Sequence, residues 1–208
     1  MGREILYDKD IREPLYLFLE ETFGKMRILE EKNTGRARAD AVMILQDCIC
    51  GIEIKSDADN YVRLQKQVRE YDKYYDMNYV VVGSSHAKHV SEHIKDYWGI
   101  IVAEKSEDGI NFTIQREPRI NPKVTWTRKL GILWRHELVV IQELNKMPRY
   151  KEKSKDFVID KIVSRLNSGK ISEASLKVQV SNVLFDRDYT LIAKEIMQYR
   201  IESRRAKR

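Results

Sequence analysis

Residues 39–45 and 48–54 are mostly hydrophobic runs on either side of the polar pair Gln46 and Asp47, which predicts two antiparallel strands joined by a two-residue turn. In that register Asp40 lies directly opposite Glu53 on the neighbouring strand. One face of the strand pair is then apolar along its whole length, and we expect it to face the core. That face holds Ala39, Ala41, Met43, Leu45, Cys48, Cys50, Ile52 and Ile54.

The opposite face of the same strand pair changes character along its length. Beside the turn it is aliphatic, and beyond Gly51 it carries Asp40, Glu53 and Lys55. A strand edge that is merely solvated scatters its charges, so two acids and a lysine gathered at one end predict a functional site. A one-residue slip would place Asp40 and Glu53 on opposite faces, which makes the register decisive.

Periodicity elsewhere predicts a helix and a strand before the hairpin, and a helix and a fully buried strand after it. The predicted spans are a helix over residues 10–23, a strand over 27–31, a polar loop over 32–38, a helix ending near residue 75 and a strand over 79–82. We expect Asp10 and Glu13 to form a capping box, and Asp57 and Asp59 to cap the second helix. A strand, a helix and a buried strand in this order form a parallel crossover, so the predicted fold class is α/β.

Beyond the buried strand the pattern first continues and then changes. A helix over residues 87–97 and strands over 100–103 and 110–115 precede Pro118 and Pro122. After these prolines every predicted element is a helix, over residues 126–145, 157–166, 173–184 and 189–203. We therefore predict an α/β domain over residues 1–120 and a helical C-terminal subdomain over residues 121–208.

Composition adds limits on class and compartment. The 208 residues are 42% hydrophobic, which is enough for a sizeable core. A formal net charge of +6 is a mild basic excess that permits a polyanionic partner without requiring one. No apolar run reaches the roughly 20 residues of a membrane span, so we expect a cytoplasmic protein with no membrane partner. Cys48 and Cys50 are expected to be reduced core residues.

Two carboxylates and an ammonium on one strand end suit a particular chemistry. Asp40 and Glu53, with the main-chain carbonyl of Ile54, would provide oxygen ligands for Mg²⁺ or Mn²⁺. Such an ion activates a bound water and neutralises charge on a phosphate oxygen. Lys55 would orient that water or stabilise the charge of the transition state, so the residues predict phosphodiester hydrolysis. The plainer interpretation is a structural ion pair between Lys55 and the acids.

The same residues resemble the PD-(D/E)xK nuclease superfamily. The resemblance rests on Asp40 followed by the triplet from Glu53 to Lys55, with Ala39 where the motif often has proline. It implies a restriction-endonuclease-like αβββαβ core and an acidic, metal-dependent catalytic site. It also implies an acid upstream of the hairpin, for which the candidate is Glu30 and the alternatives are Glu31 and Glu13.

A second motif, Gln67-x3-Tyr71, resembles that of the RecB-like branch of this superfamily, where the two residues line the active site and bind the substrate backbone. The two side chains lie one helical turn apart on one face. The strings GRARAD (35–40), GIEIKSDADNYVRL (51–64) and YWGII (97–101) are similar to a narrower group of small bacterial and phage proteins.

The resemblance implies a metal-dependent deoxyribonuclease that leaves 5′-phosphate and 3′-hydroxyl ends and acts in repair, recombination or phage defence. The alternative is a catalytically inactive nucleic-acid-binding or regulatory protein that keeps the nuclease fold. A third reading is a factor that binds another protein, such as a phage-encoded inhibitor.

Two other groups of residues have plainer explanations. His89 and His93 lie one turn apart, but their neighbours are polar, which favours a solvated helix over a transition-metal site. The basic residues of the C-terminal half are compatible with nucleic-acid contact, a lid, a homodimer surface or a solvated face. These residues are Arg128, Lys129, Arg135, Arg204, Arg205, Lys207 and Arg208.

Overall fold

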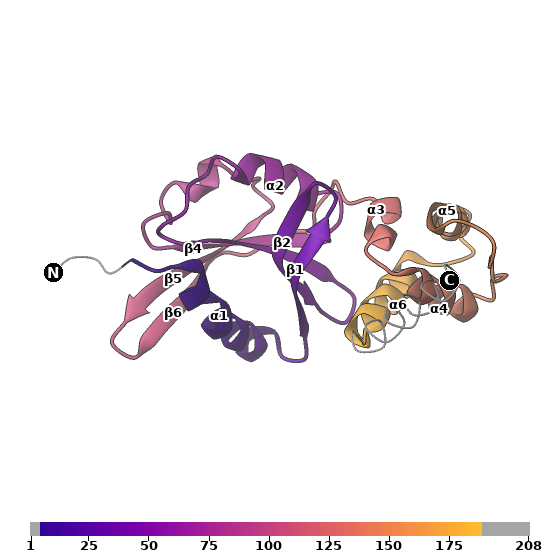
Figure 1. Cartoon of the computed structure of the whole chain (residues 1–208), viewed down its shortest axis with the longest axis horizontal. Coiled ribbons are helices and arrows are strands. Elements are labelled where there is room, and N and C mark those ends of the chain that lie inside the picture. Colours follow the sequence, from indigo (N-terminus) through magenta and orange to yellow (C-terminus); the bar gives the residue numbers. More distant parts are fainter. Residues whose placement is uncertain (1–4, 189–208) are drawn as a thin grey trace, which may run out of the picture.

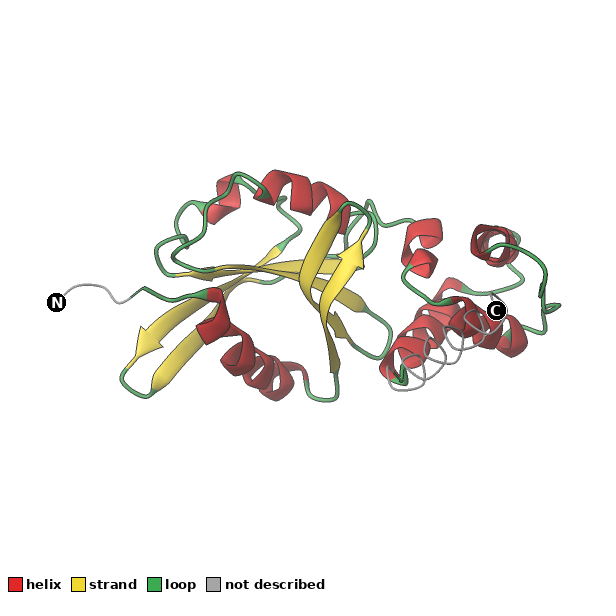
Figure 2. Cartoon of the chain, in the orientation of Figure 1, coloured by secondary structure: helices red, strands yellow, loops and turns green. Residues whose placement is uncertain are grey.

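A computed structural model describes residues 5–188 of the chain (Figure 1). Six strands form one sheet, and helices α1 and α2 lie on its opposite sides, with the remaining α-helices grouped beyond one end (Figure 2). The strands are β1 (Arg27–Thr34), β2 (Ala37–Ile44), β3 (Ile49–Lys55), β4 (Met77–Gly83), β5 (Gly99–Ser106) and β6 (Gly109–Arg116). The helices are α1 (Asp8–Phe23), α2 (Leu64–Tyr71), the 3-10 turn η1 (Val90–Glu92), α3 (Trp126–Gly131), α4 (Arg135–Leu144), α5 (Lys155–Asn167) and α6 (Glu173–Phe185).

The strands follow one another across the sheet in chain order. β1, β2 and β3 pair antiparallel, β3, β4 and β5 pair parallel, and β6 returns antiparallel to β5. The parallel step from β3 to β4 is made through α2, which confirms the predicted crossover and the α/β class. The predicted element order αβββαβ is likewise present from α1 to β4.

The predicted hairpin register is confirmed. Val42 pairs with Gly51 on β3, and the Leu45 amide donates to the Cys48 carbonyl at 2.9 Å, which closes the two-residue turn. Gly51 is required because a Cβ there would lie 2.4 Å from the Tyr75 ring. The strand pair can therefore bury both of its faces only with glycine at this position.

The face of the sheet under α1 forms the first hydrophobic cluster. The predicted apolar face contributes most of its residues to it, together with Ile11, Leu15 and Leu19 of α1. Ala39 is an exception, because it packs in the second cluster on the other side of the sheet. Next to it the β1–β2 ladder skips Glu31, whose φ is +47°, so the alternation of faces is interrupted between Ala39 and Ala41.

The second cluster lies on the α2 face and extends into the C-terminal helices. It joins Val42, Ile44 and Ile49 of the hairpin to Leu64 and Val68 of α2. It also contains buried residues of the C-terminal helices, namely Leu130, Leu138, Ile141, Val158, Ile162, Leu176, Val180 and Leu184. One core is therefore shared by the sheet and the helical half of the chain.

The boundaries of the first helix and of the loop that follows β1 differ from the prediction. α1 begins at Asp8, and Asp10 lies inside its first turn, where the carboxylate accepts the Tyr7 amide at 3.0 Å. The predicted loop over residues 32–38 is mostly strand, because β1 and β2 extend to a tight turn at Gly35 with φ +59°. The prediction was wrong because one side of this end of the hairpin faces solvent. The polar residues on that side resemble those of a loop.

α2 is shorter than predicted, and the two aspartates before it do not cap it. Asp59 accepts the Ser56 amide at 2.9 Å within the preceding turn. Asp57 accepts the Leu6 amide at 3.1 Å and the Ser85 amide at 3.1 Å. These contacts tie the N-terminal segment and the loop after β4 to the end of β3.

Two predicted helices are broken in the structure. Residues 87–97 contain only the η1 turn, where His93 stacks on Tyr61 at a centroid distance of 4.2 Å. The predicted helix over residues 126–145 divides into α3 and α4, because the Glu137 carboxylate accepts the Trp134 amide at 2.6 Å and starts a new helix. The helix predicted over residues 189–203 lies outside the described residues.

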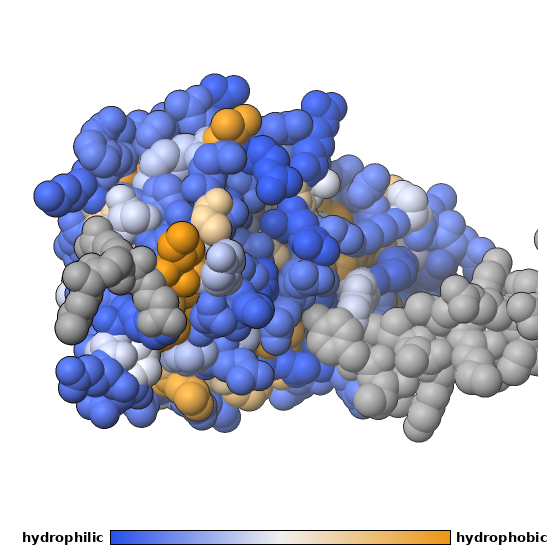
Figure 3. All heavy atoms as spheres, turned by 60° about the vertical axis from the view of Figure 1, so that its left-hand side comes forward, coloured by the Kyte–Doolittle hydropathy of each residue, from blue (hydrophilic) through white to orange (hydrophobic). Residues whose placement is uncertain are grey.

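The surface gives no sign of a membrane segment in the described part of the chain. None of its helices combines the length and apolar character that crossing a bilayer requires. On the face shown in Figure 3, hydrophobic side chains are scattered within a mostly hydrophilic surface.

Candidate active site

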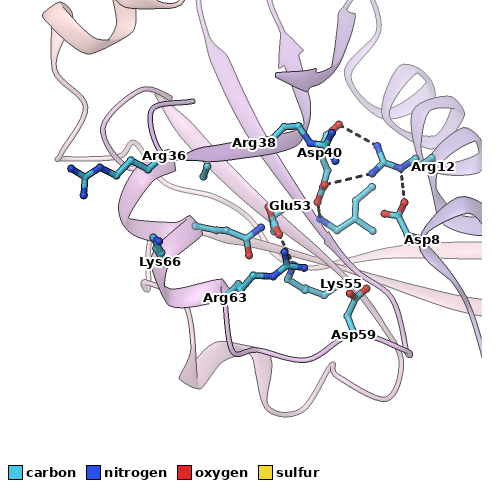
Figure 4. A pocket seen from close by; sticks show the side chains of 13 residues that line it. Asp8, Arg12, Arg36, Arg38, Asp40, Glu53, Lys55, Asp59, Arg63 and Lys66 are labelled. Atoms are coloured by element: carbon cyan, nitrogen blue, oxygen red, sulfur yellow. Dashed lines mark hydrogen bonds and ion pairs between the residues drawn. The ribbon is translucent and has the colours of Figure 1, made fainter. Parts of the chain in front are cut away.

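A pocket of about 410 Å³ lies where α1, β2, β3 and the start of α2 meet. Charged side chains from all four elements point into it (Figure 4). The lining residues are Asp8, Arg12, Arg36, Ala37, Arg38, Asp40, Glu53, Ile54, Lys55, Asp59, Arg63, Lys66 and Gln67. The predicted constellation of Asp40, Glu53 and Lys55 is thus brought together in one cavity.

Glu53 occupies the floor of the pocket and is fully buried. Its carboxylate accepts the Lys55 ammonium at 2.5 Å on one oxygen and the Tyr71 hydroxyl at 2.5 Å on the other. Lys55 and Glu53 share a face because they are two residues apart on β3. Tyr71 comes from α2, which packs over that face.

Asp40 lies beside Glu53 in the middle of β2, next to the last residue of β2 that pairs with β3. One oxygen of its carboxylate accepts the Ile54 amide at 2.8 Å, and the other lies 3.5 Å from the Arg12 guanidinium. The amide and carbonyl of one residue in an extended strand point to the same side. The Ile54 carbonyl therefore also faces Asp40, as the predicted ligand set requires.

Burial disfavours the charged forms of Asp40 and Glu53 more than their neighbours stabilise them. Burial and the neighbouring Asp40 raise the pKa of Glu53 to about 7, against the lowering effect of Lys55 and Tyr71. Burial also raises the pKa of Asp40, partly offset by the Ile54 amide, Lys55 and Arg12. The pKa of Tyr71 is raised well above its ordinary value by burial and by Glu53.

This donor set fits a hard divalent cation. Two carboxylates on adjacent strands and a strand carbonyl are oxygen ligands, and Mg²⁺ keeps several waters when protein groups fill only part of its shell. A cation would also stabilise the charged forms of both acids, which burial disfavours. Within residues 5–188, however, no cluster of three or more His, Cys, Asp or Glu side chains has metal-binding geometry.

The two residues of the second motif occupy different places. Gln67 lines the pocket, and its buried Oε1 has no hydrogen-bond partner among the described residues. Tyr71 lies behind Glu53, fully buried, and its oxygen also accepts the Asp40 amide at 3.3 Å. Tyr71 thus contacts both acids from the side away from the pocket, and its role in substrate binding stays a prediction.

The predicted upstream acid does not line the pocket. Glu30 pairs with Ala41 on the α1 side of the sheet, where its charge helps to raise the pKa of Tyr16. The alternatives are also elsewhere, since Glu31 pairs with Arg38 at 3.2 Å and Glu13 is exposed on α1.

The first turn of α1 instead supplies Asp8 and Arg12, which sequence analysis missed. Arg12 joins Asp8, at 2.7 Å, to the carbonyl of Asp40, at 3.3 Å. The spacing of four residues between an acid and an arginine was the available signal. It was lost because the helix was predicted to start at residue 10.

The remaining candidates are structural. His89 interacts with Glu92 at 3.1 Å, and His93 packs on Tyr61. Cys48 and Cys50 are free, buried thiols with sulfur atoms 3.6 Å apart. Both observations agree with the plainer explanations given above.

Comparison with known proteins places the chain in a family. No curated protein and no solved structure matches it. A family model described as bacteriophage P4 protein cII matches residues 21–199, which is most of the chain. That range includes the hairpin with Asp40, Glu53 and Lys55, as well as α2 and the helical half, and leaves out Asp8 and Arg12. The chain belongs to the bacteriophage P4 protein cII family.

Proposed function

We propose that this protein is a metal-dependent nuclease that hydrolyses phosphodiester bonds of DNA. The observation that carries the proposal is the pocket floor, where Asp40, Glu53 and Lys55 meet beside the main chain of Ile54. Such a set serves hydrolysis of a phosphate ester, because it combines oxygen ligands for a cation with a fixed ammonium. The resemblance to the PD-(D/E)xK superfamily supports the same activity and implies a setting in repair, recombination or phage defence.

Asp40, Glu53 and the Ile54 carbonyl would hold Mg²⁺ or Mn²⁺. When bound there, such an ion supplies Lewis-acid polarisation of a phosphate oxygen and a water of lowered pKa. Lys55 provides a positive charge that stabilises the oxygens of the phosphate as negative charge develops on them. Its side chain is 7% exposed, so solvent screens this charge little.

Two further residues keep the acids in place. Tyr71 fixes the rotamer of Glu53 through its hydroxyl, and the same oxygen accepts the amide of Asp40. Arg12 contacts both the carbonyl and the carboxylate of Asp40 from the other side. The floor of the pocket is therefore preorganised before any ligand arrives.

The proposal is tested by incubating labelled single-stranded, duplex and branched DNA with Mg²⁺, Mn²⁺ or EDTA. We expect cleavage with a divalent cation, none with EDTA, and none by Asp40→Asn or Lys55→Met. The substitution Glu30→Gln is a matched control, because this acid precedes the same hairpin but lies outside the pocket. It should leave cleavage unchanged.

Two results would contradict the proposal. The first is a wild type as inert as its variants on every substrate and with either cation. In that case salt-sensitive DNA binding would favour the alternative of an inactive nucleic-acid-binding module. The second is cleavage that survives both Asp40→Asn and Lys55→Met, which would mean that the activity resides elsewhere.

A further inference from the structure

The walls of the pocket carry positive charge that the pocket's own acids do not neutralise. Arg36, Arg63 and Lys66 are exposed, and among residues 5–188 none has a carboxylate within ion-pair distance. The acids of the pocket are each engaged by other groups, as Asp8 is by Arg12 and Asp59 is by the Ser56 amide. Arg36 does act on Glu70, whose pKa is lowered first by Lys73 and then by the amide and the charge of Arg36, but none of the three side chains is held in an ion pair with a described acid.

These cations stand on two walls that face each other across the acids. Arg36 belongs to the turn between β1 and β2, whereas Arg63 and Lys66 belong to the start of α2, three residues apart. In Figure 4 the Arg63 side chain extends over the pocket toward Glu53 and Lys55, and Arg36 lies at the outer edge. In the same view the Arg36 side chain points outward, away from the two acids.

The floor of the pocket is fully buried, and the cavity above it is small. Glu53 is fully buried, so a ligand reaches it only through the pocket. The cavity of about 410 Å³ is at the small end of ligand sites, which span about 300–1,000 Å³. It has room for one nucleotide unit, but not for a base pair with both of its backbones.

The two walls are also fastened together at one end. The Arg36 amide donates to the Glu70 carboxylate of α2 at 3.4 Å. At Gly35, whose φ is +59°, a Cβ would lie 2.6 Å from Glu70 and 2.9 Å from the Tyr74 hydroxyl. The turn is thus packed so closely against α2 that only glycine fits at position 35.

The lining of the pocket has no aromatic ring in the described residues, so it offers no platform for stacking a base. What it offers is positive charge and the side-chain amide of Gln67, which has an NH₂ donor. Groups of this kind recognise the sugar-phosphate backbone and carry no base information.

Given the proposed function, we infer that the pocket takes an unpaired nucleic-acid strand, gripped through its phosphates by Arg36, Arg63 and Lys66, and excludes the intact duplex. Recognition is independent of sequence. Duplex DNA is a substrate only where its strands are already separated.

The inference is tested by fluorescence anisotropy in EDTA with a labelled 12-nucleotide strand and the same sequence as a blunt duplex. We expect the wild type to bind the strand at least about tenfold more tightly than the duplex, because only the strand reaches the pocket. Replacing all three cations by alanine should reduce the slope of log affinity against log salt by about 2, at about 0.7 for each lost contact with a single strand. A rise from 50 to 200 mM salt would then weaken the wild type about 20-fold more than the triple variant.

Arg69→Ala is the matched control, because Arg69 is an exposed arginine of the same helix that does not line the pocket. It should leave the affinity for the strand unchanged. Equal affinity for strand and duplex, no binding of either, or an equal loss in Arg69→Ala would overturn the inference.

The outcome separates this inference from the proposed function. Strand binding through the three cations, without cleavage in Mg²⁺ or Mn²⁺, would remove the nuclease and leave the substrate class standing. Cleavage of intact duplex as fast as of single strands would support the nuclease and overturn the preference for an unpaired strand.

Discussion

Strand β3 has a buried ion pair near each of its ends, and the two pairs differ in what surrounds them. At its start Asp76 accepts the Ile49 amide at 2.9 Å and both carboxylate oxygens contact Lys129, at 2.6 and 2.8 Å. At its end Glu53 contacts Lys55. The first pair is enclosed, whereas the second opens onto the pocket beside another acid.

The difference shows how a structural pair and a functional pair can be told apart. Lys129 comes from α3 and also lies 4.9 Å above the Trp126 ring, so this pair joins the helical half to the sheet. Glu53 instead lies next to Asp40, and the pKa of both acids is raised by burial. Two desolvated acids side by side are poorly designed for stability and well suited to bind a cation.

The largest expected effect is on DNA cleavage, which should depend on the Glu53–Lys55 pair and not on the Asp76–Lys129 pair. Glu53→Gln should reduce cleavage at least about 10³-fold, about 4 kcal/mol of transition-state stabilisation, because it removes a charged ligand from the pocket floor. Its unfolding free energy at pH 8 should equal or exceed that of the wild type. Rates under single-turnover conditions and urea titrations measure both quantities. Retained cleavage would contradict the functional assignment of this pair.

Lys129→Met should have the opposite profile. Removing one partner of an enclosed pair leaves Asp76 buried and unpaired, which costs about 3–5 kcal/mol of unfolding free energy. Cleavage per folded molecule should stay within about twofold of the wild type, because the pocket is unchanged. Adding Asp76→Asn to Lys129→Met should recover part of the loss, and its failure to do so would remove the ion pair as the cause.

A smaller effect should appear in the pH dependence of stability without metal. The pKa of folded Glu53, about 7, exceeds its ordinary value of 4.5, so the folded state binds this proton more tightly than the unfolded state. The contribution of the group is therefore fully present below pH 4.5 and is lost as pH rises through 7, by up to about 3 kcal/mol. The raised pKa of Asp40 likewise makes stability fall as the pH rises.

Urea titrations from pH 5 to 8 in EDTA measure this loss, which Glu53→Gln should diminish and Lys129→Met should leave in place. If the free energy of unfolding of the wild type changes with pH in the same way as that of Glu53→Gln, the raised pKa of Glu53 is contradicted.

The smallest effect concerns Tyr71→Phe. Losing a buried hydroxyl should cost about 1–2 kcal/mol of stability. Because this hydroxyl lowers the pKa of Glu53, the midpoint of the stability loss and of the pH–rate profile should move to higher pH. Tyr97→Phe is the matched control, since Tyr97 donates to Asp72 at 2.6 Å outside the site. It should cost similar stability and leave both midpoints unchanged.

Alternation along the chain was enough to predict the hairpin, its register and the meeting of Asp40 with Glu53, because these depend on neighbours in sequence. The crossover through α2 and the buried β4 followed from the same patterns. The resemblance to the Gln-x3-Tyr motif implied that Gln67 lies at the site, and it does line the pocket.

What the sequence did not predict depends on contacts between distant segments. Asp8 and Arg12 enter the pocket only because α1 packs across the end of β2, and no local pattern reports that placement. Asp57 was expected to cap a helix, but its carboxylate is taken by amides 51 and 28 residues away in sequence. Lys129 was expected on a solvated or binding surface and is instead the partner of Asp76, because burial of an ion pair is decided by tertiary packing.

The core shared by the sheet and the C-terminal helices has a consequence for synthesis on the ribosome. The aliphatic face of β2 and β3 packs against residues as late in the chain as Leu184. Asp76 likewise has no ion-pair partner until Lys129 has been synthesised. At about 5–20 residues per second, the finished sheet stays uncovered for several seconds while the remaining helices are made. During that interval the nascent chain exposes the hydrophobic face of its sheet. Chaperone binding should therefore be strongest before the C-terminal helices are complete.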